Sequence, residues 1–341
     1  MSPQIPLAAR YCPYSRLGDQ PNIIVDGKAH KTTALTLSHW PWNSTPPALL
    51  RDTSTDIVFA YLDAPEYHQN IDVVSNSHFD EDGVLSMYAL VDPTNALQYR
   101  DLMIGASRAG DFAICTDADA AKLSFVLAAY FDPETSPLPA EVFTGTDAEQ
   151  VANLYNKMLQ VLPELLADIP GKQQFWEEEF AHLQESEAAI ATGKVVIDEV
   201  PELELAIVHI PDDMPVRTVR RYLTRWQRSV HPFAVHNVTQ CGRLIWVKGE
   251  SVEAQYRYES WLQLASRRPA KRVDLAGLAT QLSNIETAGG NWIFEGINEV
   301  APRLRLEGSC RSSIALDKFI AMLADWLQSQ PPAWDPYNKI N

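Results

Sequence analysis

The chain has 341 residues, more than one hydrophobic core usually fills, so we expect two domains. Apolar residues make up 46% and charged residues 21%, a composition that excludes a disordered chain. The net charge of −16 excludes non-specific binding to duplex nucleic acid, and no apolar run is long enough to cross a membrane.

The cysteines and the first residues indicate a compartment. Four cysteines lie far apart without a Cys-x-x-Cys pair, which favours reduced thiols over zinc ligands or disulfides. They are Cys12, Cys115, Cys241 and Cys310. The first sixteen residues lack a basic segment followed by an apolar one, so we expect no secretory signal. Together these features predict a cytoplasmic protein.

Strands and helices alternate in the N-terminal part of the chain. Short β-branched, apolar segments at 33–38 and 71–76 predict strands. Helical patterns are expected at 47–62, 83–91, 96–108 and 117–131. This alternation predicts an α/β fold with a parallel sheet and helices on both faces. Ligands bind such sheets beyond the carboxyl ends of the strands.

A proline-rich stretch at 132–146 suggests the first domain boundary. We therefore predict a parallel α/β domain over 1–140, a helical connector over 141–192 and a smaller, mixed α/β domain over 193–341 that binds substrate. Within the last domain the pattern predicts a hairpin from Lys194 to Ile210 and a basic helix over 215–228. Strands are then expected at 233–238 and 243–248, and helices at 274–285 and 314–328.

Charge is divided unevenly along the chain. Residues 1–145 hold 8 Lys and Arg against 18 Asp and Glu, whereas residues 215–341 hold 17 against 11. The acidic part suits cations and the basic part suits anions, although solvated surfaces explain such a bias equally well.

The strongest candidate for chemistry is the run from His78 to Gly83. His78, Asp80 and Asp82 alternate directly after a predicted strand, where alternate side chains point the same way. One nitrogen and several oxygen ligands suit Mn²⁺, with Mg²⁺ or Fe²⁺ possible, and the spacing excludes an EF-hand. We expect Gly83 to let the backbone turn tightly into the next helix. The competing interpretation is a solvated acidic turn in which Asp82 caps a helix.

The segment HFDEDGVLSMYAL resembles the first motif of the DHH phosphoesterase superfamily, in which these groups bind a pair of Mn²⁺ ions. The segment beginning LTLSHW resembles the stretch around the Asp-His-His motif, and the resemblance matches His39 to its first histidine. LMIGASRAGDF resembles a third motif and would bring Asp111 as a ligand. The motifs are degenerate and permuted, because Ser38 and Trp40 replace two family residues and His39 precedes His78. The whole chain also resembles bacterial proteins of unassigned function.

Two of these candidates have plain alternatives. His39, flanked by Trp40 and Trp42, is equally well explained as a histidine held in an aromatic loop. Asp111, after Gly110, is explained as a turn or cap residue if no metal binds.

The C-terminal part offers candidates for contact with an anionic substrate. Arginine binds phosphate or carboxylate through two parallel hydrogen bonds, although any single arginine is more often part of a structural ion pair. Gly289, Gly290 and Asn291 resemble the glycine-rich substrate loop of the domain associated with the DHH superfamily. The candidates are Arg257, Arg267, Arg303, Arg311, Gly289, Gly290 and Asn291.

Two hypotheses follow. The first is a Mn²⁺-dependent hydrolase of a phosphoester or phosphoanhydride, perhaps a small nucleotide, with His78, Asp80 and Asp82 as catalytic residues and Asp111 and His39 as further ligands. The second is a catalytically silent, DHH-like protein that binds a small anionic ligand or a protein partner. The chain lacks the fingerprints of P-loop enzymes, dinucleotide-binding enzymes, serine hydrolases and zincins.

Overall fold

The computed structural model describes residues 8–221 and 224–339. Contacts divide the chain into two units, and the division falls within α7 (Gln173–Ala191). Unit 1 contains the residues up to Ala181 together with Thr218–Gln227 and Leu264–Ser266, and unit 2 contains the remainder. None of the helices within the described ranges has the length and apolarity that spanning a bilayer requires.

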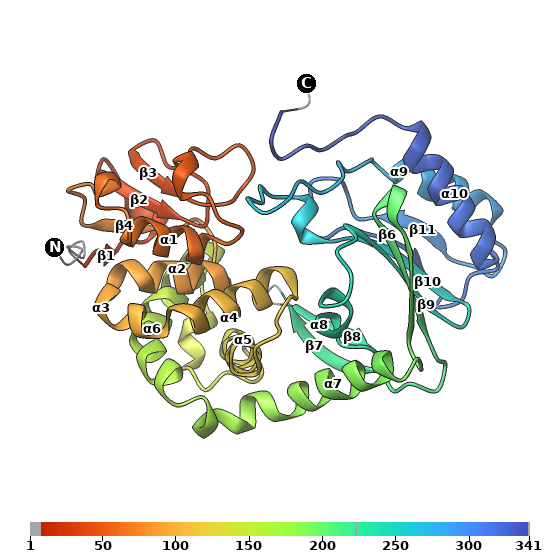
Figure 1. Cartoon of the computed structure of the whole chain (residues 1–341), viewed down its shortest axis with the longest axis horizontal. Helices are drawn as coiled ribbons and strands as arrows, with labels where there is room; N and C mark the ends of the chain where they lie inside the picture. The colour runs from red at the N-terminus through yellow and green to blue at the C-terminus, as the bar shows by residue number, and fades with distance from the viewer. Residues whose placement is uncertain (1–7, 222–223, 340–341) are drawn as a thin grey trace. The chain divides into compact units, whose positions relative to one another are not determined.

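Unit 1 is built on a four-stranded parallel sheet (Figure 1). Its strand order is β1-β4-β2-β3, and the strands are β1 (Arg10–Tyr11), β4 (Val73–Ser75), β2 (Asn22–Val25) and β3 (Thr33–Leu37). β3 and β4 match the predicted strands, whereas β1 and β2 were not predicted. β2 lies between β4 and β3, so its carboxyl end stands between the two predicted strand ends.

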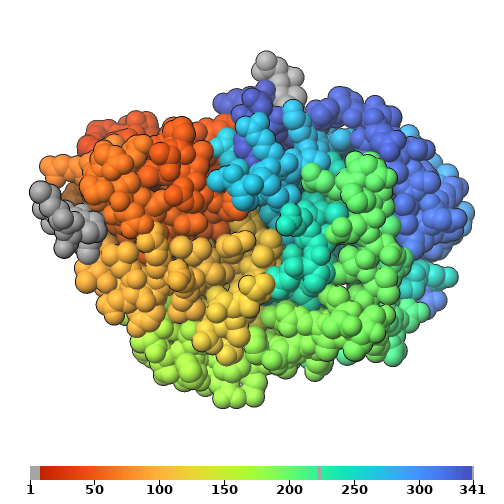
Figure 2. All heavy atoms as spheres, viewed as in Figure 1, coloured from red at the N-terminus to blue at the C-terminus, as the bar shows by residue number. Residues whose placement is uncertain are grey.

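Alternate residues of the sheet face two apolar clusters. Ile23, Val25 and Leu37 face the main core of unit 1, whereas Ile24 and Val73 face a smaller cluster with Leu17. This is the two-residue period that a β-strand imposes. Figure 2 shows side chains closing the spaces that the ribbon of unit 1 leaves open.

The helices of unit 1 pack on the main cluster. They include α1 (Ser54–Leu62), α2 (Glu81–Val91), α4 (Arg100–Phe112), α5 (Ala118–Phe131) and α6 (Asp147–Ala167). The first four confirm predicted helices. In α1 and α2 almost every residue is buried. This explains why apolar residues occur on all sides of both helices.

Unit 2 contains a mixed six-stranded sheet. Its order is β11 (Asn291–Phe294), β12 (Arg303–Glu307), β10 (Ser251–Tyr256), β9 (Arg243–Lys248), β6 (Leu205–Ile210) and β5 (Val196–Val200). β6 and β9 pair in parallel and the other neighbours pair antiparallel. α9 (Ala276–Ile285) and α10 (Leu316–Ser329) pack on this sheet. The predicted α/β fold with a second, mixed sheet is therefore confirmed.

Two local predictions in the C-terminal half were wrong. The segment predicted as a basic helix over 215–228 forms a two-stranded sheet of β7 (Arg217–Arg221) and β8 (Thr224–Arg228). The predicted strand at 233–238 begins instead as the short helix α8 (Pro232–His236). Pro232 at its first position fixes a helical φ, and the His231 side chain accepts a hydrogen bond from Phe233 N.

Candidate metal centre

Three strand ends of the parallel sheet carry polar side chains that converge in unit 1. Asp26 follows β2, His39 comes two residues after β3, and the segment from Asn76 to Asp80 follows β4. The first turn of α2 adds Asp82 and the last turn of α4 adds Asp111. This is the edge at which parallel sheets bind ligands.

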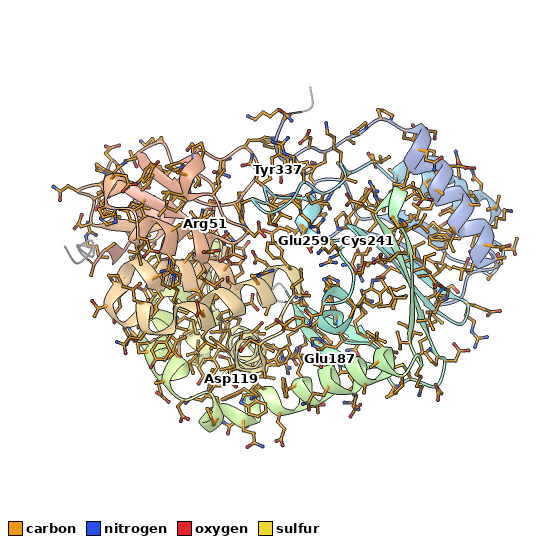
Figure 3. The ribbon with its side chains drawn as sticks, viewed as in Figure 1. Arg51, Asp119, Glu187, Cys241, Glu259 and Tyr337 are labelled. Carbon is orange, nitrogen blue, oxygen red and sulfur yellow. The ribbon has the colours of Figure 1, made fainter. Side chains whose placement is uncertain are left out.

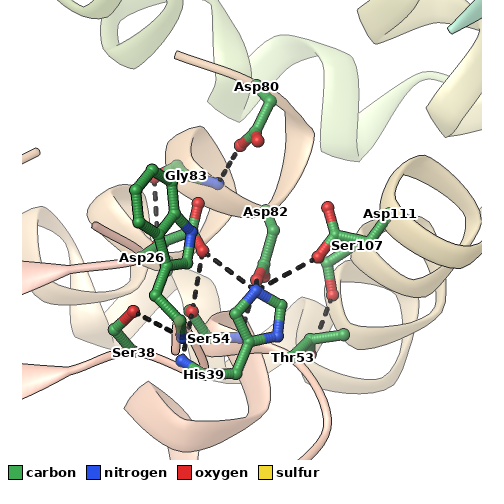
Figure 4. Close-up of polar contacts among 12 residues, drawn as sticks. Asp26, Ser38, His39, Thr53, Ser54, Asp80, Asp82, Gly83, Ser107 and Asp111 are labelled. Atoms are coloured by element: carbon green, nitrogen blue, oxygen red, sulfur yellow. Dashed lines mark hydrogen bonds and ion pairs between the residues drawn. The ribbon is translucent and has the colours of Figure 1, made fainter. Parts of the chain in front are cut away.

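Asp26 joins the two histidines. Its Oδ1 lies 3.2 Å from His39 Nε2, and its Oδ2 lies 3.2 Å from His78 Nε2. Asp82 Oδ2 and Asp111 Oδ2 lie 3.7 and 3.5 Å from His39 Nε2, while Asp80 Oδ2 lies 2.9 Å from His78 Nε2. Figure 4 shows the imidazole of His39 facing the carboxylates of Asp26, Asp82 and Asp111.

The ligand atoms thus form two groups that share one carboxylate. Asp26, His39 and Asp82 make up the buried triad, and Asp26, His78 and Asp80 make up the open triad. In each triad the ligand atoms lie within 4.8 Å of one another. The structure therefore brings together all five predicted ligands, around two points instead of one.

The reason for two points is local. β4 ends at Ser75 and α2 begins at Glu81, so His78, Asp80 and Asp82 do not continue a strand. Asp80 caps α2 through Oδ1, which accepts a hydrogen bond from Gly83 N at 2.8 Å. The helical turn then directs Asp82 away from Asp80. The cap of α2 is thus Asp80, not Asp82, and the side chain of Asp82 is buried and not solvated as the competing interpretation has it.

Asp82 is held at the first turn of α1. Its carboxylate oxygens accept hydrogen bonds from Ser54 N at 2.6 Å and Thr55 N at 2.8 Å. Free main-chain N–H groups and the helix dipole both favour a carboxylate at this position. These bonds fix Asp82 beside His39 although its side chain is fully buried.

Asp26 is the candidate ligand that the sequence interpretation missed. It is 1% exposed and adopts a left-handed φ of 42°, which is uncommon for a residue other than glycine. Ser54 Oγ donates to its Oδ1 at 2.9 Å. An unfavourable backbone conformation at a buried polar cluster is typical of functional sites. The available signal was an acid directly after a short apolar strand, which resembles an ordinary Asp-Gly turn.

Gly83 has a different role from the one predicted. It lies inside α2, where an added Cβ would stand 2.7 Å from Tyr155 Oη and 2.8 Å from Asn76 Nδ2. A side chain at this position would therefore displace two buried polar groups beside Asp80. Gly83 is required by close packing and not by a tight turn.

The second nitrogen of His39 is fixed from outside the triad. His39 Nδ1 lies 2.6 Å from the carbonyl oxygen of Asp52, so Nδ1 carries a hydrogen and Nε2 faces the carboxylates. Metal-binding histidines are oriented by this kind of hydrogen bond. The ring of Phe112 lies 6.1 Å from that of His39, and the ring of Trp40 lies 4.7 Å from that of His78, so aromatic side chains border both histidines.

Burial and crowded charge perturb the acids and histidines. Burial, followed by the charge of Asp26, raises the pKa of Asp82 to about 7, and burial beside four other acids holds the pKa of Asp111 well above its usual value. Burial lowers the pKa of both histidines, but the neighbouring carboxylates outweigh it and raise the pKa of His39 to about 9 and that of His78 to about 10. Without a cation the cluster therefore retains protons, which a metal ion would displace.

The predicted substrate-binding residues all belong to unit 2. Arg257 forms a buried ion pair with Glu259, which is labelled in Figure 3, and Arg267 lies 3.8 Å from the same carboxylate. Arg303 pairs with Glu295 at 2.8 Å, and Arg311 lies 3.7 Å from Glu250 with 76% of its side chain exposed.

The glycines of the predicted substrate loop have a structural explanation. Gly290 has a φ of 86°, and an added Cβ would stand 2.4 Å from the carbonyl oxygen of Glu307. Asn291 begins β11 and pairs with Glu307 on β12. Glycine is therefore needed for the close approach of these strands, whether or not a ligand binds there.

Unit 1 has arginines of its own beside α2. A cavity of about 310 Å³ lies between Glu81, the residues that end α5 and the β7–β8 pair. Arg220, Arg221 and Arg225 line it. Asp132 accepts from both Arg220 and Arg225, so the charges of this wall are largely balanced.

Comparison with known proteins supplies a family but no activity. The model of a family described as "Family of unknown function (DUF6687)" matches residues 7–338, and the chain therefore belongs to this family. No curated protein and no solved structure matches the chain. What the site does must be inferred from its geometry.

Proposed function

Starting from membership of a family without an assigned function, we propose that this protein is a metal-dependent hydrolase of a phosphoester or phosphoanhydride, DHH-like in its site. The observation that carries the proposal is the pair of triads sharing Asp26, whose residues would hold two divalent cations. Paired cations of this kind act in phosphatases and nucleases.

The residues fit a hard divalent cation. Carboxylate oxygens from four aspartates and two imidazole nitrogens suit Mn²⁺ best, with Mg²⁺ or Fe²⁺ possible. Asp26 Oδ2 is buried 3.2 Å from His78 Nε2, and a cation bound there would replace the proton that these two groups share. The cations would lower the pKa of a bound water and neutralise charge on the phosphoryl group.

The residues of the two triads differ in their exposure to solvent. Asp26, Asp82 and His39 are sealed from solvent, whereas 27% of the His78 side chain and 16% of the Asp80 side chain are exposed. Substrate would therefore approach from the side of the open triad. The buried triad orients the shared carboxylate and excludes water from that side of the centre.

We propose a small anionic, phosphate-containing substrate, perhaps a nucleotide. Among the predicted anion-binding arginines of unit 2, Arg311 is the most exposed and Arg257 is buried in its ion pair with Glu259. The cytoplasm remains the proposed compartment, supported by Cys12, Cys115, Cys241 and Cys310, which are all free thiols.

Replacement of Asp80 by Asn tests the proposal. Asn keeps an acceptor for Gly83 N and so preserves the α2 cap, but it removes the negative charge from the open triad. We expect Mn²⁺-dependent hydrolysis of p-nitrophenyl phosphate, bis-p-nitrophenyl phosphate or a nucleoside triphosphate to fall by at least about 100-fold.

The matched control is Asp72→Asn in the same segment. Asp72 is an acid with 74% of its side chain exposed, and it pairs only at the surface with Arg10. This variant should retain wild-type turnover. Wild-type turnover by the Asp80 variant would show that the site does not perform the hydrolysis.

The second candidate is a catalytically silent, DHH-like protein that binds a small anion or a protein partner. Two residues favour it. Trp40 lies over His78 instead of supplying a second histidine, and Ser38 accepts a hydrogen bond from Trp40 N where the DHH family has an aspartate. Thermal stabilisation by Mn²⁺ that requires His78 supports the hydrolase, whereas stabilisation by nucleotides without metal supports the binder.

A further inference from the structure

Arg221 reaches the metal centre from a distant part of the sequence. It lies at the end of β7 and is 5% exposed. Its Nη1 donates to the carbonyl oxygen of Ala109 at 2.8 Å, and its Nη2 donates to the carbonyl oxygen of Asp111 at 3.0 Å. Both acceptors belong to the last turn of α4, the helix that ends in the candidate ligand Asp111.

The last turn of a helix is where an external cation is most effective. The helix dipole makes this end negative, and carbonyl groups there can accept a further hydrogen bond; Ala109 O already accepts one from Ala113 N at 3.1 Å. α4 ends abruptly, because Ala113 directly after it adopts a left-handed φ of 54°. A planar guanidinium that bonds two carbonyls fixes both the position and the rotation of this turn.

The same turn also packs on α2. An added Cβ at Gly110 would stand 2.6 Å from Glu81 Cβ. The last turn of α4 therefore contacts both α2 and Arg221. Nη1 and Nη2 of Arg221 donate to main-chain carbonyls of this turn, while Asp111 Oδ2 lies 3.5 Å from His39 Nε2. The carboxylate is thus oriented toward the centre.

We propose that Arg221 is a positioning residue of the metal centre, which places the carboxylate of Asp111 beside His39 by bonding the end of α4. This inference rests on the proposed function in one respect, because it treats Asp111 as a metal ligand. It adds a residue from β7 to a site otherwise built from the first 111 residues.

The chain offers a matched control in the preceding residue. Arg220 belongs to the same strand and is also partly buried, but it pairs with Asp132 and Glu179 and does not bond α4. Arg221→Gln and Arg220→Gln remove the same charge one residue apart. Arg221→Lys keeps the charge without the planar two-donor geometry, and it replaces Arg221→Gln if that variant fails to fold.

The measurement is the dissociation constant of Mn²⁺ for the full chain, by titration calorimetry and by electron paramagnetic resonance of free Mn²⁺. Loss of an outer contact to a ligand typically weakens metal binding by about 10–100-fold. We expect about tenfold weaker binding in Arg221→Gln, an intermediate value in Arg221→Lys and less than about twofold change in Arg220→Gln. In an Asp111→Asn background the Arg221 substitution should add little, because the group that it positions is gone.

The outcomes separate this inference from the proposed function. Wild-type Mn²⁺ affinity in both Arg221 variants, or an undiminished effect in the Asp111→Asn background, would refute the positioning role even if hydrolysis is found. Weakened Mn²⁺ binding in a protein that hydrolyses no phosphoester would support the positioning role and refute the hydrolase. A wild-type protein that binds no Mn²⁺ would refute both.

Discussion

His39 and His78 both direct Nε2 at the carboxylate of Asp26, but one side chain is buried and the other is partly exposed. The side chain of His39 is fully buried and its Nδ1 is fixed by the carbonyl oxygen of Asp52, whereas 27% of the His78 side chain is exposed. Similar ligand sets are thus placed in one sealed and one accessible position. In the proposed centre, the buried triad would therefore hold its cation away from solvent, whereas the open triad would exchange ligands with solvent.

The shared carboxylate gives the largest expected effect. Asp26→Asn removes one negative charge from both triads, and asparagine tolerates the left-handed φ of 42°. We expect at least about 1000-fold loss of Mn²⁺-dependent hydrolysis together with loss of bound metal. Elemental analysis of protein purified without chelator gives the stoichiometry. A variant that still binds the wild-type number of ions would show that Asp26 does not bridge them.

Replacing each histidine by glutamine separates the two triads. His39→Gln should lower the free energy of unfolding by about 1–3 kcal/mol, because it disturbs the bond to Asp52 and leaves buried carboxylates facing each other. His78→Gln should change the free energy of unfolding by less than about 1 kcal/mol, because its site is partly exposed, while still weakening Mn²⁺ binding. Urea unfolding of the metal-free variants makes the comparison. Equal destabilisation by the two substitutions would contradict the division into sealed and open groups.

The sequence was sufficient to select His39, His78, Asp80 and Asp82 as candidate ligands. Each of them follows an apolar strand or lies at the start of a helix, and periodicity can detect both elements. Asp26 was not predicted as a candidate ligand, because a four-residue strand followed by Asp-Gly resembles a turn. Only the pairing of β2 between β4 and β3 places its end at the centre. Strand order is a long-range property that local patterns do not contain.

The contact of Arg221 with α4 was not predicted, for a related reason. The arginines and apolar residues of 215–228 recur at helical spacing, yet the chain there forms β7 and β8. Tertiary contacts override such a pattern, as the ion pair of Arg225 with Asp132, 93 residues earlier, illustrates. The fold class was accessible from alternation alone, whereas the partners of this strand pair required coordinates.

The smallest expected effect is the dependence of the metal-free protein on pH. The folded-state pKa values of Asp82, His39 and His78 are raised, to about 7, 9 and 10, so the folded chain binds more protons than the unfolded one. Stability should therefore fall as pH rises, through Asp82 between its usual value and pH 7 and through the histidines between about pH 6.5 and 10. Asp26 has a lowered pKa and acts in the opposite sense, but only in strong acid.

This pH dependence offers a further test of the comparison between the buried and the open triad, because Mn²⁺ should reverse the loss of stability with rising pH. Binding requires that Nε2 of both histidines lose its proton, so Mn²⁺ affinity should rise over the range in which the metal-free protein loses stability. Differential scanning calorimetry at pH 6, 7.5 and 9 should show a melting temperature that falls by roughly 2–4 °C without metal and falls less, or rises, with Mn²⁺. In His78→Gln the histidine contribution from the open triad is absent, so the remaining fall should come from His39 and from the acids with raised pKa values, which are Asp82, Asp111 and Glu81. A fall that is unchanged in His78→Gln and abolished in His39→Gln would mean that the buried triad alone retains the protons, and that the open triad is not a second cation site.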